Sequence, residues 1–112
     1  MPNPVVHFEV TGSNAPALQQ FYRDAFQWPI DANNPMQYGE VDDGGQGIGG
    51  GIGGDKPGVT FYIQVADLAT ALDQVKRLGG TVVQPITVIP NMVTFAKFAD
   101  PEGNVVGMIQ AQ

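Results

Sequence analysis

Apolar and polar residues alternate near the start of the chain. In residues 5–10, Val6, Phe8 and Val10 alternate with His7 and Glu9, the period of a β-strand with one apolar face. The next segment repeats apolar residues at helical spacing, namely at Leu18, Phe21, Tyr22, Ala25 and Phe26. Ser13 or Asn14 can cap this helix, with Pro16 in its first turn, and Pro29 ends it. The pattern predicts a strand followed by an amphipathic helix.

The same order returns in the second half of the chain. Residues 59–65 predict a strand whose apolar face carries Phe61, Ile63 and Val65, and whose other face carries Thr60, Tyr62 and Gln64. Asp67 is a suitable helix N-cap, and Gly79 is a suitable stop. The apolar stripe of the expected helix is formed by Leu68, Leu72, Val75 and Leu78. This second strand and helix therefore look like a copy of the first.

Shorter strands are expected after each helix. In the first half we predict strands at residues 29–32, 36–41 and 46–52, and in the second half at residues 81–84, 93–99 and 105–110. Each half then has the order β-α-β-β-β, with modules at about residues 4–54 and 58–112 and a linker at 53–58. A repeated module places equivalent side chains around a pseudo-twofold axis, and the space between two such sheets is a natural place for a small ligand.

Size and charge narrow the classes of function. The chain has 112 residues and a formal net charge of −6, so we treat it as one domain without affinity for nucleic acid. It lacks an apolar run of the roughly 20 residues that a membrane span needs. It also lacks cysteine, which fits a cytoplasmic protein. Half-domains of roughly 55 residues struggle to bury enough apolar surface alone, and we expect a homodimer.

Five segments, in their order, resemble the vicinal oxygen chelate superfamily. They are residues 5–10 (VVHFEV), 21–28 (FYRDAFQW), 47–51 (GIGGG), 78–80 (LGG) and 98–104 (FADPEGN). This superfamily includes glyoxalase I, extradiol dioxygenases and bleomycin-resistance proteins. The resemblance covers nearly the whole chain and is greatest to small glyoxalase-like members. It implies an α+β fold in which two βαβββ modules form a half-open eight-stranded barrel around a cavity.

The resemblance also implies where a metal would bind. Catalytic relatives hold a divalent metal with His, Gln or Glu on the first and last strands of each module, and these positions fall at His7, Gly49, Tyr62 and Gly107. Glycine has no side chain to offer, whereas a metal site needs three or four donors. We therefore expect no metal cofactor. Glu9 and Glu40 leave a rebuilt divalent-metal site conceivable.

Other catalytic classes find little support. Ser13 is the only serine and stands at a predicted helix cap, and cysteine is absent, so a Ser or Cys nucleophile paired with His is not expected. Residues 49–54 match G-x-G-x-x-G, but a strand and not a helix is expected after them, so the match lacks the context of a dinucleotide site.

We expect a small organic ligand to contact the polar faces of the two leading strands. The candidate ligand-binding residues are His7, Glu9, Thr60, Tyr62 and Gln64. Binding of this ligand without a metal is the leading hypothesis, and whether the protein is also an enzyme stays open. The alternatives are a metal-dependent lyase, isomerase or dioxygenase with a rebuilt metal site, and a purely structural interaction module.

Overall fold

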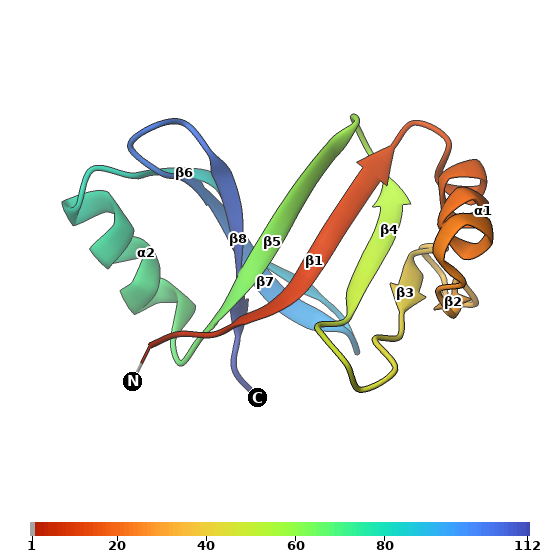
Figure 1. Ribbon diagram of the computed structural model, residues 1–112. Coiled ribbons are helices and arrows are strands. Elements are labelled where there is room, and N and C mark those ends of the chain that lie inside the picture. The colour runs from red at the N-terminus through yellow and green to blue at the C-terminus, as the bar shows by residue number, and fades with distance from the viewer. Residues whose placement is uncertain (1) are drawn as a thin grey trace. The chain divides into compact units, whose positions relative to one another are not determined.

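The computed structural model describes residues 2–112, which divide into two compact units (Figure 1). The first module, residues 7–60, contains most of β1 (Val5–Gly12), α1 (Ala15–Phe26), β2 (Ile30–Asp31), β3 (Gly39–Val41) and β4 (Gly50–Gly54). The second module combines residues 61–112 with residues 2–6. It contains most of β5 (Gly58–Val65), α2 (Leu68–Arg77), β6 (Thr81–Ile89), β7 (Val93–Ala99) and β8 (Val105–Gln110). The predicted α+β class and βαβββ modules are confirmed.

The strands of the two modules follow the same plan. The order is β2-β3-β4-β1 in the first module and β5-β8-β7-β6 in the second. In each, the leading strand pairs in parallel with the last strand, and the remaining pairs are antiparallel. Neither set of four strands closes into a complete barrel, as the half-open prediction requires.

Helix α1 covers one face of the first module's sheet. Asn14 caps it as predicted, since its Oδ1 accepts a hydrogen bond from the Ala17 amide at 3.2 Å. The buried side chain of Gln19 donates through Nε2 to the carbonyl oxygens of Ile52 and Gln37, at 2.8 and 3.1 Å. These bonds join the helix to β4 and to the segment before β3. The apolar side of the sheet therefore faces α1.

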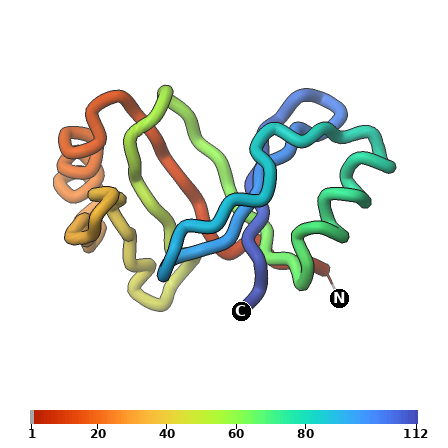
Figure 2. The backbone as a smooth tube through the Cα atoms, turned by 180° about the vertical axis from the view of Figure 1, so that it is seen from behind, coloured from red at the N-terminus to blue at the C-terminus, as the bar shows by residue number. Residues whose placement is uncertain are grey.

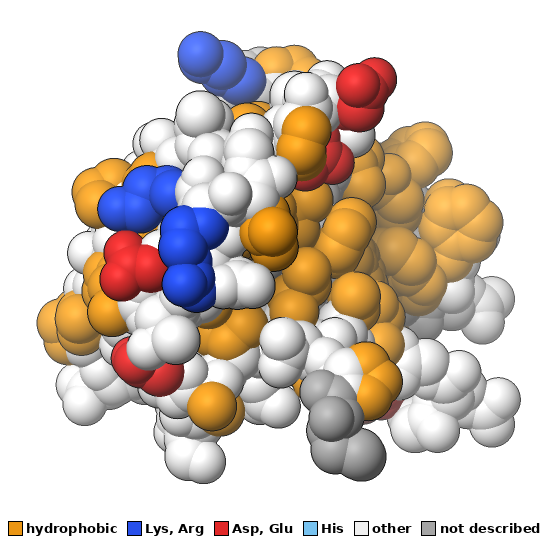
Figure 3. Space-filling view, turned by 90° about the vertical axis from the view of Figure 1, so that its left-hand side faces the viewer, with side chains coloured by type: hydrophobic (Ala, Val, Ile, Leu, Met, Phe, Trp, Pro, Cys, Tyr) orange, Lys and Arg blue, Asp and Glu red, His pale blue; other side chains and the backbone are white. Residues whose placement is uncertain are grey.

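The second module has the larger apolar core. Its buried residues come from β5, α2, β7 and β8 and are Val65, Leu68, Leu72, Ala96 and Met108. The predicted N-cap at Asp67 is only partly right, because its carboxylate accepts from the Thr70 hydroxyl and not from a helix amide. Gln110 from β8 instead accepts a hydrogen bond from the Leu68 amide, at 2.9 Å. On the α2 side, acidic and basic side chains lie beside many hydrophobic ones (Figure 3).

Strands β1 to β6 differ from the sequence-based boundaries, three of them by only one or two residues at an end: β1 continues to Gly12, β2 covers only Ile30–Asp31, and β5 begins at Gly58. Strand β6 extends to Ile89 and not only to residue 84, and it runs beside β7 along the hairpin (Figure 2). Its register with β7 shifts around Pro85, because proline is accommodated where a strand is irregular or at a sheet edge. Strands β3 and β4 begin later than expected, at Gly39 and Gly50, and β4 includes Gly53 and Gly54, which the sequence assigns to the linker. Within residues 2–112, neither helix combines the length and apolar character of a bilayer crossing.

Candidate ligand-binding site

His7 and Glu9 project from the face of β1 opposite α1. On the α1 side, a Cβ added at Gly50 would lie 2.3 Å from the Phe8 ring, and Phe8 also contacts Trp28, with ring centroids 5.4 Å apart. A Cβ at Gly12 would lie 3.2 Å from Leu18 of α1. Because successive residues of a strand point to opposite faces, His7 and Glu9 lie on the other side. The predicted face assignment is confirmed for the first module.

Tyr38 joins these two side chains on the polar face. Its hydroxyl oxygen lies 2.9 Å from His7 Nε2 and 2.9 Å from Glu9 Oε2. A carboxylate only accepts hydrogen bonds, so the Tyr38 hydroxyl donates to Glu9 and accepts from the Nε2–H of His7. The His7 and Tyr38 rings are nearly parallel, with 19° between their planes. Two side chains of β1 and a tyrosine from the distant segment before β3 thus form one hydrogen-bonded cluster.

Two features hold the Tyr38 ring in place. Asn34 bonds the backbone of Tyr38 twice, because its Oδ1 accepts from the Tyr38 amide at 3.0 Å and its Nδ2 donates to the Tyr38 carbonyl at 2.7 Å. The ring then lies on the bare backbone of β4. A Cβ at Gly51 would stand 1.9 Å from the ring, and one at Gly53 would stand 2.9 Å from it. The glycines of β4 are therefore needed for close approach of this ring.

Burial keeps His7 neutral near pH 7. Loss of solvent lowers the pKa of His7 below its ordinary value of 6.5, and the nearby carboxylates of Glu9 and Glu40 oppose this shift only in part. Glu40 pairs with Gly51 in the β3–β4 register, which places it on the same polar face. The face therefore combines a neutral imidazole, a phenol hydroxyl and two carboxyl groups, a set able to donate and accept hydrogen bonds.

The polar face of the second module is built on a different tyrosine. Tyr62 stands opposite Gly107 in the β5–β8 register, and its ring occupies the space that a Cβ at Gly107 would enter, at 2.2 Å. Tyr62 is buried and meets Phe95 edge to face, with centroids 6.4 Å apart. Lys97 Nζ lies 6.0 Å from the centre of the Tyr62 ring. This face is thus more aromatic than that of the first module.

The residues at the positions implied for a metal do not fit one. Phe8 donates from its amide to the Gly49 carbonyl at 3.2 Å, so Gly49 lies beside the leading strand as Gly107 lies beside Tyr62. Both glycines lack a donor side chain, and His7 Nε2 already bonds the Tyr38 hydroxyl. In the described part of the chain, no three His, Asp or Glu side chains come close enough to share a metal ion. A metal site on these residues would require rearrangement of the cluster.

The structure brings some of the predicted site residues together. It brings His7 and Glu9 together through Tyr38, and it places Tyr62 on the second module's polar face, where Gln64 follows in the β5–β8 register. Thr60 is half-buried in β5. That these residues bind a ligand stays a prediction. Tyr38 was missed, although its alternation with Glu40 in the expected strand at residues 36–41 was the signal that could have found it.

Comparisons with known proteins agree with this architecture. The glyoxalase-like domain model matches residues 7–109. A comparison with curated protein sequences gave no match. Among solved structures, a glyoxalase/bleomycin resistance protein/dioxygenase superfamily member from Vibrio splendidus 12B01 superposes with a TM-score of 0.68 at 16% identity. That match covers 98% of this chain and 100% of the other.

Two further matches are epimerases. Methylmalonyl-CoA epimerase from Mycobacterium tuberculosis has a TM-score of 0.68 at 11% identity, covering 96% of this chain and 87% of that one. A methylmalonyl-CoA epimerase in complex with methylmalonyl-CoA and NH4+ has a TM-score of 0.65 at 14% identity, covering 99% and 96%. At such identities the structural likeness speaks for the fold alone. With the family model matching nearly the whole chain and the βαβββ modules in place, this protein belongs to the glyoxalase-like domain family.

Proposed function

We propose that this protein binds a small organic ligand on the polar faces of its modules, without a metal ion. The observation that carries the proposal is the Tyr38 hydroxyl, which joins His7 and Glu9 at 2.9 Å each above the glycines of β4. This cluster is connected by hydrogen bonds and locally preorganised, as the polar groups of ligand sites commonly are. The five residues predicted from the sequence remain in the proposal, and Tyr38 joins them.

The chemistry of the cluster favours a ligand over a metal. A bound divalent cation needs three or four donor atoms arranged around it. His7 and Glu9 are instead both directed to the Tyr38 hydroxyl. A neutral imidazole with a phenol and a carboxylate suits an organic molecule that itself carries hydrogen-bonding groups. Glycines at both implied final-strand positions support the same choice. The absence of a metal stays part of the proposal.

A ligand screen on chelator-treated protein tests this function. Ligand-observed NMR against a library of small polar organic compounds should give hits, and calorimetry should then compare their affinity in wild-type, Tyr38→Phe and His7→Ala proteins. We expect Tyr38→Phe to weaken binding about tenfold, because it removes a hydroxyl that orients both partners. Tyr22→Phe is the matched control, since Tyr22 belongs to the aromatic cluster with Phe26 and Trp28 at α1.

The outcomes separate clearly. Weaker binding in Tyr38→Phe and His7→Ala, with unchanged binding in Tyr22→Phe, supports the proposal. Equal losses in all three variants would show that the cluster has no special part in binding. A complete lack of hits from the library, or hits that appear only after a divalent metal is restored, would refute metal-free ligand binding.

The second candidate is a metal-dependent lyase, isomerase or dioxygenase. The presence of Glu9, Glu40 and His7 on one sheet face favours it, and the methylmalonyl-CoA epimerase with a similar fold suggests a substrate to test. Solvent deuterium exchange into methylmalonyl-CoA, with Mg²⁺, Mn²⁺ or Co²⁺ and without any of them, gives a direct test of isomerase activity. Metal-dependent exchange that disappears in Glu9→Gln would establish this candidate in place of the first.

A further inference from the structure

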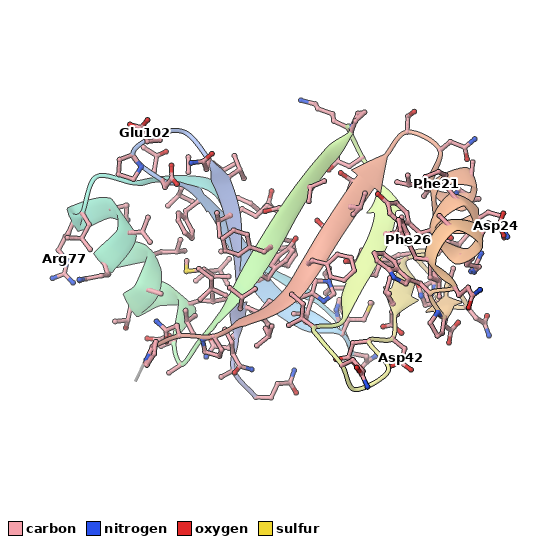
Figure 4. All side chains as sticks on the ribbon, viewed as in Figure 1. Phe21, Asp24, Phe26, Asp42, Arg77 and Glu102 are labelled. Atoms are coloured by element: carbon pink, nitrogen blue, oxygen red, sulfur yellow. The ribbon has the colours of Figure 1, made fainter. Side chains whose placement is uncertain are left out.

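Lys97 lies on a strand, whereas the other two cations of the second module lie on a helix. Residues 61–112 carry three basic side chains, and two of them, Lys76 and Arg77, are exposed in the last turn of α2. Figure 4 labels Arg77 at this end of the helix. Lys76 pairs there with Asp73, at 3.5 Å. Lys97 instead lies on β7, between Ala96 and Phe98, whose side chains pack in the core under α2. By strand alternation, Lys97 projects from the opposite, polar face.

The register places Lys97 in one row with the tyrosine. Lys97 pairs with Gly107 across β7 and β8, and Gly107 pairs with Tyr62 across β8 and β5. Because Gly107 has no side chain, Tyr62 and Lys97 meet above it, with Nζ 6.0 Å from the ring centre. On its other side, Lys97 pairs with Gln84 of β6. The row therefore presents a cation, an aromatic ring and an amide side by side.

Within the second module, aromatic and apolar side chains lie near this cation. In the next row, Phe95 pairs with Ile109 and meets the Tyr62 ring edge to face. Lys97 is half-buried, and it is the one charged side chain that the strands of residues 61–112 place on this face. A partly desolvated ammonium interacts more strongly with an anion than an exposed one does, because screening by water is weaker.

We infer that this row recognises an anionic group, and that the ligand is an organic carboxylate with an apolar or aromatic body. The inference rests on the proposed function, that the polar faces bind a small organic molecule. In this arrangement Lys97 Nζ donates to the carboxylate, Gln84 offers an amide nearby, and Tyr62, Phe95 and Ile109 contact the apolar body. Selectivity for anions then comes from one local charge, in a chain whose net charge of −6 repels them at long range.

Matched pairs of small compounds test this inference. Phenylacetate and phenylacetamide have the same body, as do hexanoate and hexanamide, and differ in charge. Dissociation constants from NMR titration should be lower for the carboxylate of each pair by about tenfold, the ratio that one charge-assisted hydrogen bond supplies. Lys97→Met should abolish this preference because it weakens carboxylate binding more than amide binding, and Lys97→Arg should retain part of the preference. Lys76→Met, which removes an exposed cation from α2, is the matched control.

Failure of the inference differs from failure of the proposed function. If carboxylates and amides bind equally in the wild type, or if Lys97→Met leaves the preference intact, recognition of an anion by Lys97 is wrong, although metal-free ligand binding still holds. If neither member of either pair binds, this inference is overturned, and the library screen decides the proposed function separately. An equal loss of carboxylate affinity in Lys76→Met would show a bulk effect of charge and would also overturn the inference.

Discussion

Replacing Gly51 with alanine tests the packing of Tyr38 most directly. A Cβ at Gly51 would stand 1.9 Å from the Tyr38 ring, whereas nonbonded carbons approach to roughly 3.5–4.0 Å. The ring must then move by more than an ångström. Hydrogen bonds of 2.9 Å to His7 and Glu9 do not survive such a shift, since they weaken rapidly beyond about 3.2 Å.

The size of the effect follows from these losses. Two hydrogen bonds contribute about 1 kcal/mol each, and inserting a methyl group into a filled space costs about 1–3 kcal/mol. If the ring swings clear of β4, the strain is relieved and only the bonds and contacts are lost. We therefore expect Gly51→Ala to lower the free energy of unfolding by about 2–4 kcal/mol. Urea unfolding, followed by the fluorescence of Trp28, measures this value.

A double-mutant cycle separates the Tyr38 contact from other effects. In a Tyr38→Ala background the space above Gly51 is open, so Gly51→Ala should be nearly neutral there and the coupling energy should approach the single-mutant cost. Gly47→Ala is the control, because a Cβ at Gly47 meets no atom within 4 Å. The reasoning is refuted if Gly51→Ala costs less than about 0.5 kcal/mol, the usual scale of a neutral surface substitution, or costs the same in both backgrounds.

Four further expectations concern stability and assembly. Burial lowers the pKa of His7 below 6.5, so the unfolded chain takes up the proton at a higher pH than the folded chain does. The free energy of unfolding should therefore fall as pH drops below 6.5, and above that pH it should not depend on His7. His7→Gln should remove this slope in urea titrations at several pH values. Gln19→Leu should cost about 2–4 kcal/mol, because two carbonyl oxygens lose their donor, whereas exposed Gln20→Leu should be nearly neutral; equal values would contradict this. Asn14→Ala should cost about 1 kcal/mol through loss of the helix cap, with Ser13→Ala as the control, and equal midpoints for the two would argue against the cap. Light scattering at micromolar concentration should give a mass near twice 11.9 kDa, and a monomer mass would exclude the expected dimer.

The sequence was sufficient for most of the fold because its signals are local. The alternation in residues 5–10 and 59–65 predicted both leading strands and, for the first, the face that carries His7. Strands β7 and β8 were predicted at their observed boundaries, residues 93–99 and 105–110. Glycine has no side chain, so a glycine-rich segment does not show the alternation of apolar and polar residues that marks a strand. The glycine-rich segment at residues 49–54, interrupted only by Ile52, therefore concealed the true position of β4.

The site was less accessible from the sequence because its contacts are not local. Tyr38 is separated from Glu9 by 29 positions and from His7 by 31, and it reaches them only because Gly51 and Gly53 leave the sheet bare. The sequence shows these glycines but not which ring covers them. The same applies to Lys97, whose neighbour Tyr62 is defined by strand register across β8. Residue types predicted the chemistry, and pairing of strands decided which groups meet.

Strand β1 is divided between the two modules after residue 6, and this division has a consequence for folding during synthesis on the ribosome. Residues 7–60 are contiguous, so the first module has all its parts once that stretch has left the exit tunnel. The second module includes residues 2–6, and the Gln64 amide donates to the Pro4 carbonyl at 2.9 Å. Residues 2–6 must therefore meet β5 across the whole length of the first module, which raises contact order and slows folding. We expect ribosome-bound chains to protect the first module from protease well before the second.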